Sequence, residues 1–208
     1  MASTRPASTD PIRDFKFSVE ISAGDNSRLR TLTNGIFNMG FAVVTGLSVT
    51  NEVIQYREGG MNTHPHKMVG QSDYGPVTFS RGVFYNSDQL YKWQQFMHTW
   101  NSGQVNGTLS ESDHNDYRCK IGVRVLDHPA TGSAYVSDPG VFSNDTNPLA
   151  LPEMRIGFVL YNCWPGAFSM TDLNASSSAG ILVQQMTIHH EGFVLVNNKD
   201  EYEAAMKA

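Results

Sequence analysis

Two segments of the sequence alternate strictly between apolar and polar residues, and this alternation most constrains what the chain can fold into. The first segment is DFKFSVEIS, whose apolar members are Phe15, Phe17, Val19 and Ile21. The second is YRCKIGVRVLD, whose apolar members are Tyr117, Cys119, Ile121, Val123 and Val125. Successive side chains of a strand point to opposite faces, so residues 14–22 and 117–126 each predict a strand with one buried and one wet face.

Five further runs are rich in β-forming residues: GFAVVTGLSV, NEVIQYRE, PVTFSRGVF, RIGFVLYNCWP and AGILVQQMTIHHEGFVLV. We interpret RIGFVLYNCWP and AGILVQQMTIHHEGFVLV as the last two strong strands of the chain. The sequence contains no repeat of fixed period and no second candidate core. It therefore predicts one mostly antiparallel β domain with one main helix.

The helix is expected over residues 87–101. Its apolar residues recur at three- and four-residue steps: Leu90, Trp93, Met97 and Trp100. Asn86 or Ser87 can cap its N-terminus, and Gly103 lies just past its end. We expect the apolar stripe to pack onto the sheet.

The domain organisation follows from composition along the chain. Residues 1–13, rich in Ser, Thr and Pro, predict a flexible N-terminal arm, and residues 14–198 form the single β domain. Polar, loop-rich insertions are expected at about 101–116 and 128–153. The C-terminal tail, residues 199–208, is expected to form a short helix.

The charge balance bears on the class of partner. The chain has 208 residues, of which 17% are charged, and a formal net charge of −5. A protein that binds nucleic acid through phosphate contacts is normally basic, so the charge argues against that function. The low charged fraction suggests that part of the surface is covered by a partner.

The two cysteines, Cys119 and Cys163, lie in apolar strand-like stretches and are expected to be buried free thiols. The N-terminal residues lack the apolar segment of a signal peptide. Nor does any run reach the roughly 18 apolar residues needed to span a bilayer. We therefore expect a soluble protein made in a cytoplasm.

Two histidine clusters are candidates for metal or catalytic sites. In THPHK, His64 and His66 share one face of an extended segment, but no further ligand with zinc spacing lies nearby. In HHEG, His189 and Glu191 share a strand face and lack the helical geometry of zinc proteases. The expected reading of both clusters is structural.

The search for a nucleophile gives no candidate. Both cysteines lie in surroundings that raise a thiol pKa, and the serines lack the G-x-S-x-G spacing. Glycine-rich dinucleotide and phosphate loops are also missing from the sequence. We therefore expect no enzymatic activity, no metal and no cofactor.

The segment from Val53 to Gly70, VIQYREGGMNTHPHKMVG, gathers charged and turn-forming residues. The Gly59–Gly60 pair suits a tight turn. Polar residues follow from Met61 to Asp73, so the segment predicts a loop or hairpin that reaches outward from the sheet. Open sheet edges favour pairing with other chains, which suggests a subunit that assembles with copies of itself.

The chain resembles the tail tube proteins of contractile-tailed bacteriophages, a family shared with the tube proteins of contractile injection systems and Hcp-like proteins. Four stretches carry the resemblance over roughly residues 12 to 196: DFKFSVEI, GFAVVTGLSV, YREGGMNTHPHKMVGQSDYGPVTFSRGVF and NCWPGAFSMTDLNASSSAGILVQQMTIHHEGF. They occur in the family's usual order. The third is the most specific of the four.

The resemblance implies an antiparallel β-sandwich or barrel-like subunit flanked by one helix. Six subunits would form a ring with a continuous inner β-barrel, and rings would stack into a hollow tube. A contracting sheath would drive this tube through the host envelope and let the genome pass. The implied partners are other copies of the chain, the tail sheath, baseplate, tail terminator and tape measure proteins, and DNA in transit. The implied location is the virion tail, assembled in the host cytoplasm.

The resemblance also implies a subunit or ring interface in the YREGG region. Its residues are Tyr56, Arg57, Glu58, Gly59, Gly60 and Lys67. A tube that conducts DNA should not bind it, so we expect neutral or acidic residues to dominate the lumen wall. Arg118, Lys120 and Arg124, on the polar face of one expected strand, would oppose transit if they faced the lumen alone.

Three alternatives remain open at this stage. The first is the inner tube of an injection system or a type VI (Hcp-like) hexamer. The second is a monomeric β-barrel that binds a small apolar ligand between Trp93, Trp100 and Trp164. The third is a metal hydrolase; its ligands would be His64, His66, His189 and Glu191.

Overall fold

The computed structural model describes residues 12, 14–23, 29, 40–60, 63–85, 88–101, 117–126, 154–173 and 180–207. The strands are β1 (Phe17–Ser22), β2 (Val43–Thr45), β3 (Val49–Tyr56), β4 (His66–Tyr74), β5 (Val77–Gly82), β6 (Cys119–Leu126), β7 (Met154–Met170), β8 (Val183–His189) and β9 (Gly192–Val196). The helices within these residues are α2 (Gln89–Asn101) and α3 (Lys199–Lys207). The expected N-terminal arm and both expected insertions lie almost wholly outside the described residues.

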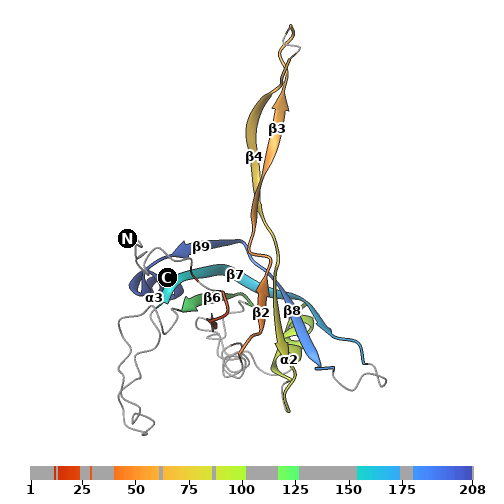
Figure 1. The fold of residues 1–208 in the computed structure, drawn as a ribbon. Helices are drawn as coiled ribbons and strands as arrows, with labels where there is room; N and C mark the ends of the chain where they lie inside the picture. Colours follow the sequence, from red (N-terminus) through yellow and green to blue (C-terminus); the bar gives the residue numbers. More distant parts are fainter. Residues whose placement is uncertain are drawn as a thin grey trace, which may run out of the picture.

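The strands form an antiparallel sandwich with a separate hairpin (Figure 1). Sheet A consists of β1, β6, the first half of β7 and β9, whereas sheet B consists of the second half of β7, β8, β5 and β2. The 17-residue strand β7 thus belongs to both sheets. β3 and β4 pair only with each other among the described strands. The predicted mainly antiparallel β fold is confirmed.

The main core lies between the two sheets. Along β6, Cys119, Ile121 and Val123 are buried, as the alternation predicts, and along β5 Val77 and Phe79 point inward. Arg81 follows on the same face of β5 and is fully buried. Its guanidinium carbon lies 5.8 Å from the centre of the Phe41 ring, and burial lowers the pKa of the Arg81 side chain.

Helix α2 closes this core, and its predicted position is confirmed within two residues. Leu90 and Trp93 of the predicted apolar stripe are fully buried against the sheet residues, whereas Met97 is only partly buried and the Trp100 side chain lies outside the described residues. Asp88, just before the helix, forms an ion pair with Lys92 at 2.8 Å. An acidic group at this end also suits the helix dipole.

The structure corrects the strand boundaries near the C-terminus. RIGFVLYNCWP does not end its strand at Pro165, because β7 continues to Met170 beside β8. AGILVQQMTIHHEGFVLV is two strands, since the chain turns between His189 and Gly192. The ladder with β8 keeps β7 extended through the proline, and the turn sends β9 back along the first half of β7.

The C-terminal helix α3 packs on the outer face of sheet A. Tyr202 and Met206 are buried in a second cluster with Met154, Val159 and Val196. The predicted helical tail is therefore confirmed, but the expected wet face of β6 is partly covered by it. A β-carbon on Gly122 would overlap the Tyr202 hydroxyl, so the glycine gives the helix its close approach to the strand.

Both cysteines are buried free thiols, as predicted. Cys119 and Cys163 face each other across β6 and β7, and the Cys119 thiol donates a hydrogen bond of 3.4 Å to the Cys163 carbonyl. Burial raises the pKa of the Cys163 thiol to about 12, so it stays protonated at neutral pH. Within the described helices, none has the length and apolar character needed to cross a membrane.

We predict that Gly122→Ala destabilises the subunit by about 1–3 kcal/mol, because the added methyl group overpacks the contact with Tyr202. Urea unfolding followed by circular dichroism measures this change. Gly82→Ala is the matched control, since its methyl group meets no atom within 4 Å. Equal midpoints for the two variants would contradict this account of how α3 docks.

Candidate functional site

The most unusual surface of the molecule is the β3–β4 hairpin, which projects away from the sandwich (Figure 1). All eight residues of β3 are exposed. At about 3.3 Å per residue, β3 spans about 26 Å. A two-stranded hairpin of this kind has no sheet beneath it to bury its side chains and is marginally stable alone. The predicted outward-reaching hairpin is confirmed.

Both faces of the hairpin carry exposed apolar pairs. Val53 lies opposite Val69 on one face, and Ile54 lies opposite Met68 on the other. Val69 is 76% exposed, and the other three are about half exposed. Apolar side chains on both faces of an unsupported ribbon indicate that another surface covers it.

The distal end of the hairpin holds all six residues of the predicted interface. Tyr56 pairs with His66 and Gln55 with Lys67 at the last rungs of the ladder. Beyond them, Gly59 and Gly60 form a turn in which Gly60 has φ +98°, a conformation that favours glycine. The structure therefore brings Tyr56, Arg57, Glu58, Gly59, Gly60 and Lys67 together at an exposed tip.

A small aromatic cluster anchors the base of the hairpin, and sequence reasoning missed it. The His190 ring Nε2 donates a hydrogen bond of 3.0 Å to the carbonyl of Gly75, between β4 and β5. The Tyr74 ring packs against both His190 and Phe193, with centroid distances of 5.8 and 5.9 Å. His190 is only 8% exposed. The signal in the sequence that could have indicated a buried His190 is its place between two apolar strand segments.

At the described positions, the outer face of sheet B carries no Asp, Glu, Lys or Arg, and it ends at Trp164 and His189. Across β2, β5, β8 and β7 its residues include Thr45, Thr78, Ser80, Gln185, Thr187, Ala167 and Ser169. Thr78 and Thr187 lie opposite each other, with hydroxyl oxygens 3.4 Å apart. Among the described positions that alternate onto this face, none is Asp, Glu, Lys or Arg.

The three cationic residues of the second alternating segment lie elsewhere, at sheet A. Arg124 forms an ion pair with Glu20 at 3.4 Å, and Arg118 forms one with Glu191 at 3.5 Å. Lys120 donates to a carbonyl of α3, Ala205, at 3.5 Å. These contacts direct the positive charges towards acidic residues and helix α3, away from the outer face of sheet B.

Sheet B ends in two different strand edges. Within the described part of the chain, β2 pairs only with β5, and the second half of β7, residues 164–170, pairs only with β8. Each edge therefore presents backbone donors and acceptors to whatever lies beside it. Because the edges belong to different strands, a contact between them is head-to-tail.

The structure separates the residues of the alternative metal site. His64 and His66 lie on the hairpin, with ring centres 6.2 Å apart, whereas His189 stacks on Trp164 in the sandwich at 4.7 Å. Glu191 accepts a hydrogen bond of 2.6 Å from the Asn162 side-chain amide. In the described residues, no three His, Cys, Asp or Glu side chains are grouped to hold a metal ion.

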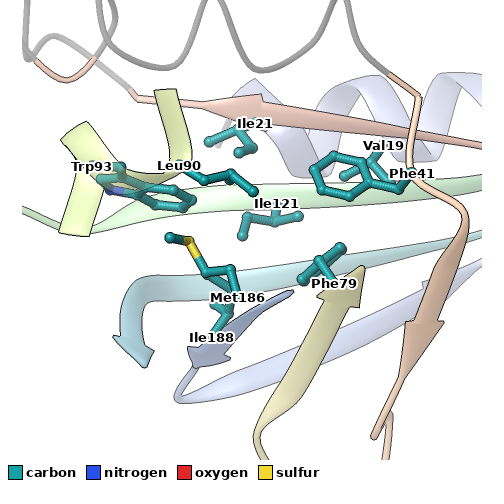
Figure 2. Close-up of a pocket in the computed structure, with 9 residues that line it drawn as sticks. All are labelled: Val19, Ile21, Phe41, Phe79, Leu90, Trp93, Ile121, Met186 and Ile188. Atoms are coloured by element: carbon teal, nitrogen blue, oxygen red, sulfur yellow. The ribbon is translucent and has the colours of Figure 1, made fainter. Parts of the chain in front are cut away.

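In the part of the chain that the structure describes, Trp93 and Trp164 do not line a common pocket. Trp93 lines a cavity of about 10 Å³ inside the sandwich, together with apolar residues of both sheets (Figure 2). This volume is at or below what one water molecule needs. Trp164 lies outside that cavity, against His189, and the Trp100 side chain is outside the described residues.

Comparison with known families gives one clear match. The model of the T4-like virus tail tube protein gp19 family matches residues 13–194, most of the chain. No curated protein sequence is significantly similar to the chain.

Solved structures support the fold. A chain of the sheath–tube complex of an extracellular contractile injection system, PVC, in its extended state shares 19% identity, with 92% of this chain and 95% of that chain covered and a TM-score of 0.58. A chain of the anti-feeding prophage cap shares 20% identity, with 95% of this chain and 99% of that chain covered and a TM-score of 0.58. A chain of the anti-feeding prophage baseplate shares 21% identity, with 92% of this chain and 99% of that chain covered and a TM-score of 0.58.

We predict that Gly60→Ala loosens the hairpin tip, because alanine at φ +98° is strained by about 1 kcal/mol. Amide hydrogen exchange at Tyr56 and Lys67 should become about fivefold faster. Gly59→Ala is the matched control, since Gly59 has no positive φ and open space around its α-carbon. Equal exchange rates in the two variants would show that the turn does not depend on Gly60.

Proposed function

Since the chain belongs to the T4-like virus tail tube protein family, we propose that it closes into hexameric rings that stack into a hollow tail tube. It is a structural tube subunit. In this proposal, sheath contraction drives the tube through the host envelope, and the genome passes along its lumen. The observation that carries the proposal is sheet B, with its uncharged outer face and two unlike edges.

Ring closure uses the edges of sheet B. The β2 edge of one subunit pairs with residues 164–170 of β7 in the next, so each subunit uses both edges once. A head-to-tail contact of this kind closes into a ring when the rotation between subunits fits. The joined sheets form one inner barrel, which removes open edges that would otherwise cause aggregation.

The outer face of sheet B lines the lumen in this arrangement. Its Thr, Ser and Gln side chains offer hydrogen bonds to water but no positive charge to phosphates. Binding of DNA by a protein surface depends mainly on Lys and Arg contacts to phosphates. A wall without Lys or Arg therefore lets DNA slide without being held.

The hairpin makes the contacts between subunits of neighbouring rings. Arg57, Glu58 and Lys67 at its tip provide charges that pair with a neighbour, and the apolar pairs along its length provide buried area. One exposed ion pair is worth about 1 kcal/mol or less, but a closed ring repeats it at each subunit.

The proposed partners beyond the chain itself are the sheath, baseplate, terminator and tape measure proteins, with DNA in transit. The similar solved structures are described as a sheath–tube complex, a tube-terminating cap, a baseplate and a sheath/tube terminator, which supports the first three. The tape measure protein and DNA follow from a hollow tube alone. The proposed location is the tail of a virion or related particle, assembled in the host cytoplasm.

A second candidate is the inner tube of a contractile injection system. The solved structures with a TM-score of 0.58 come from such systems, and this likeness concerns the fold. The role of the subunit in a stacked tube is the same in both candidates. They differ in what the lumen carries.

Negative-stain electron microscopy of the purified chain tests the proposal. We expect six-fold rings at low protein concentration and hollow tubes at higher concentration. Size-exclusion chromatography with light scattering should give the corresponding masses. A protein that stays monomeric at every concentration would contradict the proposal.

We predict that Glu58→Lys impairs tube formation and leaves the subunit folded, because it reverses a charge at the exposed hairpin tip. Fewer and shorter tubes should be seen by electron microscopy, with an unchanged circular dichroism spectrum. Glu203→Lys makes the same charge change on α3, far from the hairpin, and serves as the control. Normal tubes from Glu58→Lys would rule out a role for this charge.

A further inference from the structure

The end of sheet B opposite the hairpin carries a second group of exposed apolar side chains. We call it the end patch: Phe84, Tyr85, Met170, Leu173 and Ile181. Three of these side chains are more than three-quarters exposed: Tyr85 at 94%, Leu173 at 87% and Ile181 at 78%. Large exposed apolar side chains gathered at one end of a subunit mark an interaction surface.

Backbone hydrogen bonds bring the end patch together from three segments. The amide of Val83 donates to the carbonyl of Leu182 at 2.9 Å, which brings the segment that carries Phe84 next to the segment that carries Ile181. The amide of Thr171 donates to the carbonyl of Val183, also at 2.9 Å. The patch is therefore held by the ends of β5, β7 and β8.

The hairpin and the end patch lie at opposite ends of the same strand. β5 begins at Val77, two residues after Gly75 at the hairpin base, and ends at Gly82, just before Phe84. Figure 1 shows the hairpin leaving the body at one end of sheet B, while the end of β7 and the beginning of β8 lie towards the other. At about 3.3 Å per residue, the six residues of β5 separate the two surfaces by about 20 Å.

We propose that the end patch receives the β3–β4 hairpin of a second copy of this chain, in the adjacent ring. This inference rests on the proposed function, and it identifies the surface that the hairpin contacts. β4 leads through Gly75 and Pro76 into β5, so the hairpin leaves the barrel wall at the rim of its ring. A copy placed beyond that rim in the same orientation presents its end patch.

The two surfaces match in chemistry. Val53, Val69, Ile54 and Met68 are aliphatic, whereas Phe84 and Tyr85 supply flat aromatic area for them to cover. Asp172 lies exposed within the patch and can pair with Arg57 or Lys67 of the hairpin tip, which also carries Glu58. The contact is head-to-tail, so it propagates from ring to ring without end.

The first test replaces two residues of the end patch. Leu173→Glu with Ile181→Glu should leave six-fold rings intact and raise the protein concentration needed for tubes by about tenfold or more, because buried apolar area is lost. Leu195→Glu, at an exposed apolar position on β9, is the matched control and should form normal tubes. Normal tubes from the patch variant overturn the inference.

The same experiment separates this inference from the proposed function. If the unmodified chain forms neither rings nor tubes, the proposed function fails and this inference fails with it. If the unmodified chain and the patch variant both form tubes, only the inference fails. Loss of rings as well as tubes in the patch variant also counts against it, because the patch would then serve contacts within the ring.

The second test uses cysteine cross-linking in assembled tubes. Val69→Cys and Met68→Cys probe the two faces of the hairpin, and each is combined with Leu173→Cys. The native thiols are buried, so a short bifunctional maleimide should join only the introduced ones. We expect a ladder of multimers from at least one double variant, and no ladder from the single variants.

The pattern of products decides the geometry of the contact. Each subunit offers one hairpin and one end patch, so a head-to-tail contact gives multimers longer than dimers. Products that stop at dimers indicate a reciprocal contact and overturn the arrangement. Tubes that give no cross-linked product with either double variant overturn it as well.

Discussion

A single strand, β7, belongs to both sheets of the sandwich, and the arrangement of the other elements depends on how it bends. Its first half pairs with β6 and β9, and its second half with β8. Near the end of the first half, Asn162 has φ 53° where the pairing with β6 shifts register, and within the second half a bulge at Gly166 puts an extra residue against the His189 ring. A bulge bends and twists a strand, so the second half leaves sheet A. That departure creates sheet B and gives it an edge unlike the one at β2.

The sequence predicts the elements whose pattern is local. The alternation around Ile121, the stripe through Leu90 and Trp93, and the Gly59–Gly60 turn each fix a structure through neighbours in the chain. The bend of β7 is not predictable in this way, because Pro165 and Gly166 are residues that usually end a strand. Only the ladder with β8, supplied from a later part of the chain, holds them extended.

The proposed assembly surfaces are likewise predictable from the sequence only where they depend on a local pattern. The outward hairpin is predictable from its glycines, whereas the exposure of Val53 and Val69 is not, since valines in a strand ordinarily indicate a core. The uncharged face of sheet B depends on the register that aligns Thr78 with Thr187 and Ser80 with Gln185. His190 reads as part of a polar cluster, and its contact with Gly75 depends on a residue 115 positions away.

In the proposed assembly, the two directions of growth use different chemistry. Around the ring, backbone groups of β2 and β7 form hydrogen bonds. These bonds do not depend on which side chains lie on the lumen face. That face is therefore free to remain uncharged for DNA transit. Along the tube, side chains of the hairpin and a neighbour provide the contact, and their position relative to the ring depends on the anchor at His190 and Tyr74. The anchor couples the two directions, because it fixes the hairpin to the strands that form the barrel wall.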